Sequence, residues 1–181
     1  MLSSARGLLA LIAATLALAA GCGGNDDGGS SADEWASSVC TAIGSWMDSV
    51  NAVADSIKAD PTQQGVEEAV GDLTNSTENL VEDLKGLGRP ETEAGQQAQE
   101  SVDELTNELD QSVTAMESAV EDASGASGFL NAVSVVSGNL VTMSQNVSST
   151  LASIEQLEGG DELQQAFEQS DACADLRSSG S

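Results

Sequence analysis

The chain has 181 residues, of which 30 are acidic and 5 are basic, so its formal net charge is −25 at pH 7. Proteins that bind nucleic acid need clustered Lys and Arg to neutralise phosphates, and this charge therefore excludes nucleic acid as a partner. The chain also contains no His. This removes the commonest general base, the Ser–His and Cys–His nucleophile pairs and imidazole metal ligands, so we expect no enzyme, no metal site and no cofactor.

The first 21 residues have the layout of an export signal. Arg6 provides a short positive region, and residues 8–20 are apolar apart from one threonine. That run is too short to cross a bilayer core, which needs about 20 apolar residues. It is typical of a signal peptide rather than of a membrane anchor.

Three small residues then precede Cys22, and this ending resembles the lipobox of bacterial lipoprotein precursors. The resemblance implies that residues 1–21 are removed, that Cys22 receives a diacylglycerol thioether and that the new N-terminus is acylated, for instance with palmitate. We therefore expect a lipid anchor at the extracytoplasmic face of the cell membrane. The acyl chains must provide this attachment, because anionic lipid headgroups repel so acidic a chain.

Residues 22–31 are expected to form the lipidated cysteine and a flexible tether. After Cys22 this segment contains only Gly, Asn, Asp and Ser, none of which can join a hydrophobic core. Its root-mean-square reach is roughly 15–18 Å. The acidic residues within it lack the spacing and the final Glu of a calcium-binding loop, so we expect no calcium site there.

Apolar residues then recur at intervals of three and four, the spacing of one face of an amphipathic helix. The first helix is expected to end at Asp60. We expect the second to be capped by Asp60, with Pro61 as its first residue and Gln63 at the third position. The first apolar stripe consists of Val39, Ile43, Trp46, Val50, Val53 and Ile57. The second consists of Val66, Val70, Leu73, Thr77, Leu80, Leu84 and Leu87.

Three further helices are expected in the remainder of the chain. The third runs from about 90 to 123, and the fourth from about 129 to 158 with Ser127 as its N-cap. A short fifth helix begins at a cap on Asp161 and presents Leu163, Ala166 and Phe167 on its inner face. The third stripe is Ala98, Val102, Leu105, Leu109, Val113, Met116, Val120 and Ala123, and the fourth is Val133, Val136, Leu140, Met143, Val147, Leu151, Ile154 and Leu157.

Four long stripes joined by short connections predict an all-α protein. We expect an antiparallel up-down-up-down four-helix bundle with a short C-terminal fifth helix, spanning residues 32–177. Residues 178–181 are expected to be a disordered tail. No strand-like alternation of polar and apolar residues competes with this interpretation.

Two cysteines remain once Cys22 carries lipid. In an exported protein an even number favours a disulfide, and the expected topology brings Cys40 and Cys173 to the same end of the bundle. Such a bond would close nearly the whole domain into one loop and contribute about 5 kcal/mol to stability as an upper figure. The alternative, a redox-active pair of thiols, is disfavoured because neither cysteine has a C-x-x-C partner or a basic neighbour.

Carboxylates occur as adjacent pairs in several of the expected helices. Neighbouring helical residues point about 100° apart, so the two members of such a pair seldom converge on one substrate. We expect these pairs to lie on solvated faces. They are Glu67-Glu68, Glu82-Asp83, Asp103-Glu104, Glu121-Asp122 and Asp161-Glu162.

The layout of the whole chain is similar to one group of proteins. Trp35 stands five residues before Cys40 at the opening of the domain, and Cys173 stands three before Leu176 at its end. With the lipobox, the tether and four amphipathic helices, this resembles the small secreted helical lipoproteins of high-GC Gram-positive bacteria. The resemblance implies no activity and no site residues.

Two functions are compatible with these features. The first is a non-catalytic surface interaction or structural module that presents an acidic bundle to a protein or envelope partner. The second is a small-ligand carrier or sensor with an apolar pocket between helices, where small inner residues such as Thr77, Ala98 and Ala123 either leave a void or let helices approach closely. A pocket of several hundred Å³ favours the carrier, and a solid core with an exposed apolar patch favours the interaction module.

The lipid anchor is tested by Cys22→Ser. This substitution removes the thiol to which the diacylglycerol is attached, so the precursor should keep its signal peptide and leave the detergent-extractable fraction. Intact mass and detergent partitioning of the wild-type and variant proteins measure this. Identical processing and partitioning of the two proteins would contradict lipidation at Cys22.

Overall fold

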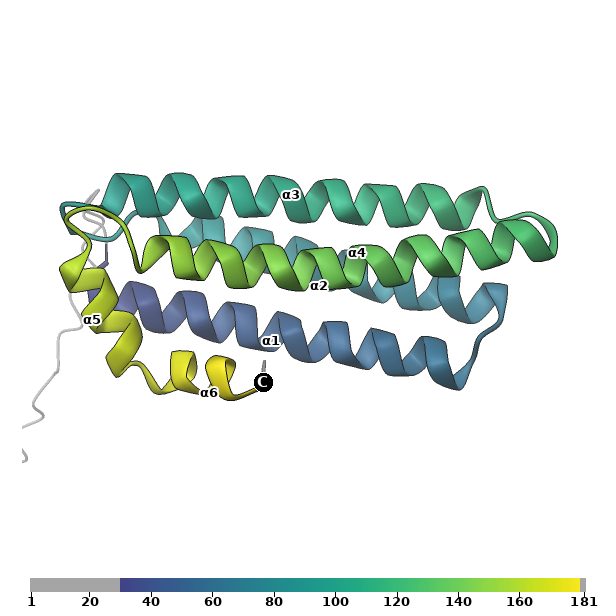
Figure 1. Cartoon of the computed structure of the whole chain (residues 1–181), viewed down its shortest axis with the longest axis horizontal. Coiled ribbons are helices and arrows are strands. Elements are labelled where there is room, and N and C mark those ends of the chain that lie inside the picture. Colours follow the sequence, from purple (N-terminus) through teal and green to yellow (C-terminus); the bar gives the residue numbers. More distant parts are fainter. Residues whose placement is uncertain (1–29, 180–181) are drawn as a thin grey trace, which may run out of the picture.

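The computed structural model describes residues 30–179, and within this range it contains six α-helices and no β-strand (Figure 1). The all-α prediction is therefore confirmed. The signal peptide, Cys22 and most of the tether lie outside the described residues. The helices are α1 (Ala32–Ala59), α2 (Gln63–Leu87), α3 (Gly95–Glu121), α4 (Gly125–Ile154), α5 (Asp161–Gln169) and α6 (Asp171–Ser179).

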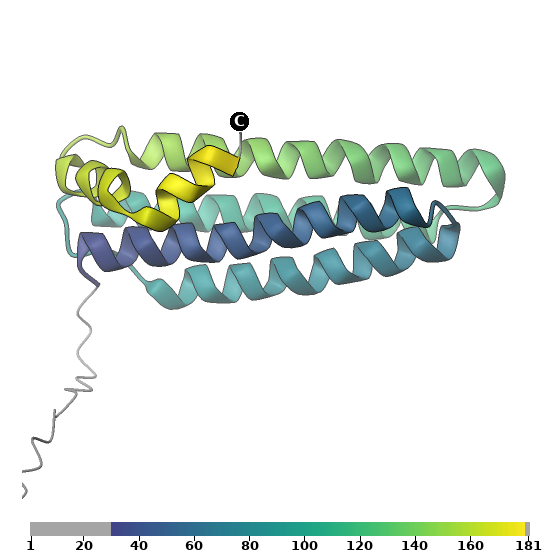
Figure 2. The same cartoon turned by 90° about the horizontal axis from the view of Figure 1, so that it is seen from below.

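The four long helices lie side by side, and the two short ones fold back over α1 (Figures 1 and 2). Extensive contacts join α1 to α2, α2 to α3, and α3 to α4. By contrast, α1 and α4 meet only weakly, while α5 and α6 both pack against α1. The seam between the first and last long helices is therefore the least closed part of the structure.

The apolar stripes form the core as expected. Every stripe position of α1, α2 and α3 is buried except Ile57 and Leu87 at two helix ends, which are half-buried. In the fourth stripe, Val133, Leu151 and Leu157 are also only half-buried. This weaker burial matches the weak packing of α4 against α1.

Two tryptophans fix the neighbours of α1. The indole N–H of Trp46 donates to the hydroxyl of Thr77 on α2 over 3.0 Å inside the core, which explains why a threonine occupies an inner position. The indole N–H of Trp35 donates to the carbonyl of Gly88 over 3.0 Å, at the end of α2. The Trp35 ring also meets Phe167 of α5 edge-on, with ring centroids 6.0 Å apart. These contacts tie the start of α1 to both α2 and α5.

The N-cap predicted for the second helix was wrong. Thr62, rather than Asp60, caps α2, and its side chain accepts a hydrogen bond of 3.1 Å from the N–H of Gly65. Asp60 instead ends α1, where its N–H donates to the carbonyl of Ser56. Gly65 is required here because a Cβ at this position would collide with the carbonyl oxygen of Asp60.

The starts of α3 and α4 also differ from expectation. Residues 90–94 form turns rather than helix, because the N–H of Thr92 donates to Pro90 and that of Gly95 to Thr92. In addition, α4 starts at Gly125, so Ser124 rather than Ser127 is the capping residue, and its side chain makes no capping bond. The C-terminal end of α4 was expected at about residue 158, but the helix ends at Ile154.

The C-terminal region contains one helix more than predicted. The short fifth helix is confirmed, with Leu163, Ala166 and Phe167 buried, but Gly160 rather than Asp161 occupies its capping position. Beyond it, α6 was not predicted. The hydroxyl of Ser170 accepts from the N–H of Cys173 over 3.4 Å at its start. This helix extends to Ser179, past the expected end of the domain at 177.

The packing of α1 is tested by Trp46→Ala. Trp46 is only 2% exposed, so truncation removes a large buried side chain and should lower the free energy of unfolding by about 3–5 kcal/mol in urea denaturation. Ser37→Ala, on the exposed side of the same helix, is the matched control and should change it by less than about 0.5 kcal/mol. A similar small change for Trp46→Ala would show that this stripe faces solvent.

Candidate functional site

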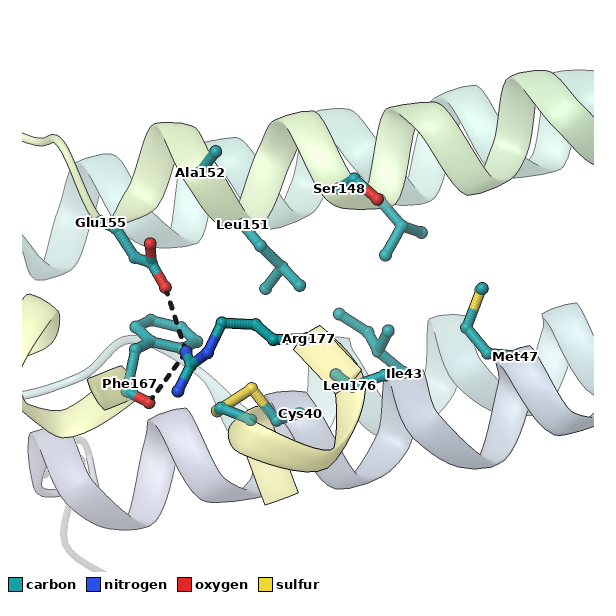
Figure 3. Close-up of a pocket in the computed structure, with 12 residues that line it drawn as sticks. Cys40, Ile43, Met47, Ser148, Leu151, Ala152, Glu155, Phe167, Leu176 and Arg177 are labelled. Atoms are coloured by element: carbon teal, nitrogen blue, oxygen red, sulfur yellow. Dashed lines mark hydrogen bonds and ion pairs between the residues drawn. A yellow bond between two sulfur atoms is a disulfide. The ribbon is translucent and has the colours of Figure 1, made fainter. Parts of the chain in front are cut away.

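An apolar pocket of about 350 Å³ lies in the seam between α1 and α4, with α5 and α6 closing one end (Figure 3). Four helices contribute its walls. Apolar side chains and the disulfide make up most of the lining, and charged groups occur only on Glu155 and Arg177. The lining residues are Cys40, Ile43, Met47, Val147, Ser148, Leu151, Ala152, Glu155, Phe167, Cys173, Leu176 and Arg177.

The predicted disulfide is confirmed and forms part of this wall. Cys40 and Cys173 are bonded, with their Cα atoms 5.0 Å apart, inside the range that a disulfide normally spans. The bond holds α6 against α1, where Leu176 lies over Gly44. The disulfide was expected to have a stabilising role, and in the structure the two cysteines also line the pocket.

Phe167 forms the closed end of the pocket. Its own burial, at 1% exposure, and its edge-on contact with Trp35 hold the ring in place. Trp35 in turn donates a hydrogen bond to the carbonyl of Gly88, the residue that follows α2. Phe167 is therefore linked through Trp35 both to α1 and to the end of α2.

The charged groups of the pocket meet at the same end. Arg177 places its Nη1 atom 3.8 Å from Oε1 of Glu155 and donates to the carbonyl oxygen of Phe167 over 3.4 Å. Figure 3 shows the guanidinium between these two partners, while Met47 and Ser148 lie toward the other end. The side chains of Arg177 and Glu155 are 49% and 33% exposed, so a bound molecule can reach them from solvent.

A second, more open pocket of about 450 Å³ continues along the same seam. Ser148 belongs to both pockets, and the second carries no charged side chain. We call the two together the α1–α4 groove. From Glu155 to Leu140 it extends about 22 Å along α4, by the rise of an α-helix. The residues that line the second pocket are Val50, Ala54, Leu140, Val141, Ser144, Gln145, Ser148 and Ser149.

The small inner residues singled out in the sequence do not form this groove. Thr77 is occupied by its hydrogen bond from Trp46, and Ala98 and Ala123 are packed in the core. None of the three lines either pocket. The groove arises instead because the disulfide and Phe167 place α5 and α6 against α1, beside the seam that α1 and α4 leave open.

A charge-free stretch distinguishes α4 from the other long helices. Residues 123–154 contain no Asp, Glu, Lys or Arg. On the exposed side of this helix Leu130 and Val141 are 68% and 57% exposed. Among the described helices α4 alone is long and apolar enough to cross a membrane by length and composition, a test that core helices of soluble proteins also pass. We call its exposed side the charge-free face.

The acidic residues lie where they were expected. All five pairs of adjacent carboxylates are on exposed positions. Among residues 30–179, no group of three or more His, Cys, Asp or Glu side chains is close enough to hold a metal ion. The acidic surface is therefore spread over the outer faces rather than gathered into one site.

Comparison of the chain with protein-family models, with curated proteins and with solved structures found no match. The function therefore has to be argued from the groove, the charge-free face and the acidic surface. Of these, the groove is the only one that is concave and apolar with a few polar groups at one place, which are the properties of small-molecule sites.

Reduction of the disulfide tests what holds α6 over the groove. We expect the melting temperature to fall while most helical circular dichroism persists, because the core of the four long helices does not depend on the bond. Amide hydrogen exchange should rise first in α6. The Cys40→Ala/Cys173→Ala variant, which has no bond to lose, should not respond to reductant. Free thiols at Cys40 and Cys173 in the untreated folded protein would contradict this role.

Proposed function

We propose that residues 32–177 form an antiparallel up-down-up-down four-helix bundle whose first and last helices frame a binding groove. The short connections between the long helices and the packing order α1–α2–α3–α4 support this arrangement. The return of α5 and α6 to α1 supports it as well, because it requires α4 to end near the start of α1.

The function that this geometry supports best is that of a small-ligand carrier or sensor. The observation that carries it is the pocket of about 350 Å³ with a predominantly apolar lining. Its size lies within the range of about 300–1,000 Å³ typical of ligand sites. Because the polar groups are confined to one end, the ligand would be held by apolar contact and oriented by that end.

Catalysis is not part of the proposal. The charged groups at the pocket are one carboxylate and one guanidinium, which pair with each other. Among residues 30–179, no other ionisable side chain lines the pocket to act as a second acid or base. The proposed role is therefore to bind and release a molecule without changing it.

The carrier would act outside the cytoplasm, anchored to the cell membrane through lipid on Cys22. The lipobox-like ending of the signal segment supports this location, as does the Gly- and Asp-rich tether that follows it. The disulfide agrees with it because such bonds persist in oxidising compartments outside the cytoplasm. A short tether would keep the groove within reach of the membrane surface.

A second function rests on a different observation. The charge-free face of α4 exposes Leu130 and Val141 on a protein whose other long helices are acidic. Such a face suits contact with a protein or envelope partner, because no carboxylate has to be desolvated there. This is the surface interaction module, and of its two exposed apolar residues only Val141 also lines the groove.

Matched Leu→Trp substitutions on α4 separate the two functions. Leu151 projects into the pocket and is half-buried, so Leu151→Trp should fill the pocket and weaken binding of Nile red, a neutral apolar fluorophore, at least about tenfold, the cost of losing one or two kcal/mol of contact. Leu130→Trp adds the same ring on the exposed side of the helix and should leave the affinity unchanged. Fluorescence titration measures both.

Each other outcome of this titration decides against the carrier. Absence of Nile red binding by the wild-type protein would contradict it directly. Loss of binding in Leu130→Trp with full binding in Leu151→Trp would place the probe on the charge-free face and favour the interaction module. The melting temperatures of both variants show that the comparison is between folded proteins.

A further inference from the structure

Within the proposed carrier function, on which this inference rests, we propose that the ligand of the α1–α4 groove is an uncharged lipid with one unbranched alkyl chain. Its neutral head, a hydroxyl or similar group, lies beside Glu155 and Arg177. The alkyl chain runs from there through both pockets toward Leu140.

The groove is long and narrow, because its lining residues follow the axes of two helices. Those of α1 recur at intervals of three or four, which places them on one face of the helix. They are Cys40, Ile43, Met47, Val50 and Ala54. On α4 the lining runs from Glu155 to Leu140, about 22 Å by the helical rise. A trough of this form accommodates an extended chain along its whole length, whereas a compact ring system would occupy only part of it.

The cover over α1 changes along this trough. Cys40 and Ile43, at the end where α6 packs, are 2% and 1% exposed, whereas Met47 and Ala54 further along are half-buried. Figure 3 shows Leu151 and Ile43 facing one another across the first pocket, with Met47 toward its far end. An alkyl chain that enters between Leu151 and Ile43 would continue over Met47 and Ala54. It would thereby cover apolar surface that α6 does not reach.

The charged end of the groove favours a head without charge. Arg177 lies 3.8 Å from Glu155 and also donates to the carbonyl oxygen of Phe167, so both charged groups already have partners in the protein. An anionic head would compete with Glu155 for the guanidinium, and a cationic head would compete with Arg177 for the carboxylate. A hydroxyl head does neither, because a carboxylate accepts several hydrogen bonds and Glu155 can accept one more while it keeps Arg177.

The α4 wall beyond this end suits an alkyl chain. The hydroxyl of Ser148 donates to the carbonyl of Ser144, and that of Ser144 donates to the carbonyl of Leu140, each over 3.0 Å. Because these donors are satisfied within the helix, a chain can cover them without leaving a hydrogen bond unmade. Gln145 is exposed, so its amide can remain in water at the rim. The wall therefore offers contact to a chain and demands no charge or polar group from it.

The shape of the ligand is tested with three alcohols, octanol, dodecanol and cyclododecanol, by displacement of Nile red below the solubility limit of each. Dodecanol and cyclododecanol have the same number of carbon atoms, so the comparison isolates the fit of an extended chain. We expect dodecanol to bind at least about fivefold more tightly than cyclododecanol. It should bind at least about tenfold more tightly than octanol, because its additional CH₂ groups reach the second pocket.

The charge of the head is tested with two further probes of the same chain length, dodecanoate and dodecyltrimethylammonium, below their critical micelle concentrations. Both should displace Nile red at least about fivefold more weakly than dodecanol at pH 7. The reason is that each charged head disturbs the pair between Glu155 and Arg177, whereas the hydroxyl leaves it in place.

A pair of matched variants tests the path of the chain. Gln145→Glu places a carboxylate of nearly the same shape in the second pocket, where a chain would have to desolvate it. Dodecanol should therefore bind at least about fivefold more weakly, while octanol, held by the first pocket, should change by less than about twofold. Thr142→Glu adds the same charge at an exposed position of α4 that lines neither pocket, and should leave both alcohols unaffected.

The outcomes separate this inference from the carrier function. A smaller preference for dodecanol over cyclododecanol, or none, would overturn the extended chain and leave the carrier intact. Tighter binding of dodecanoate or dodecyltrimethylammonium than of dodecanol would overturn the neutral head. Equal effects of Gln145→Glu and Thr142→Glu on dodecanol would overturn the path through the second pocket. Failure of Nile red and of every alcohol to bind would reject the carrier itself. The comparison of dodecanol with cyclododecanol needs no variant, so it decides even if Gln145→Glu does not fold.

Discussion

The covalent bond between Cys40 and Cys173 holds the C-terminal helices against α1, and the shape of the seam follows from that placement. With α5 and α6 occupying the side of α1 that faces the seam, α4 packs mainly on α3. Apolar side chains that would be covered in a closed bundle, such as Leu151, remain half-buried at the seam. The structure leaves this apolar surface in a groove rather than burying it, which is the feature that a binding function requires.

The groove lies along the helix that carries no charged residues. The acidic residues cover the outer faces of α2 and α3, whereas α4, which forms one wall of the groove, carries no charge over residues 123–154. An apolar ligand can bind along this uncharged trough without burying a carboxylate, so binding there carries no cost of carboxylate desolvation. At one end of the trough the guanidinium of Arg177 lies 3.8 Å from the carboxylate of Glu155. The same neutral stretch exposes Leu130 and Val141, so α4 is involved in both proposed functions.

The sequence predicted the core well because heptad spacing records which face of each helix is buried, and even Thr77 fell at its observed inner position. Helix ends were predicted less well. Asp60 and Thr62 lie within three residues and both have side chains suited to an N-cap, but it is Thr62 whose extended backbone precedes α2 and whose side chain makes the capping bond. An apolar pocket between helices was one of the two alternatives, but its position at the seam between α1 and α4 was not predicted. The spacing of apolar residues shows which face of a helix is buried but not which other helix that face contacts. In addition, α6, which closes the groove, has too few apolar residues to form a recognisable stripe. The pairing of Cys40 with Cys173 was predictable, but its position in a pocket wall was not.

The central claim is that the seam between α1 and α4 binds an apolar ligand. Methyl-resolved NMR of the protein, labelled at Ile, Leu and Met and titrated with Nile red, tests it most directly. Contacts from the probe should appear at the methyl groups of Ile43, Met47, Leu151 and Leu176, which line the first pocket, and not at those of the buried Leu73, Leu109 and Met116. Contacts confined to Leu130 on the charge-free face, or no contacts at all, would contradict the claim.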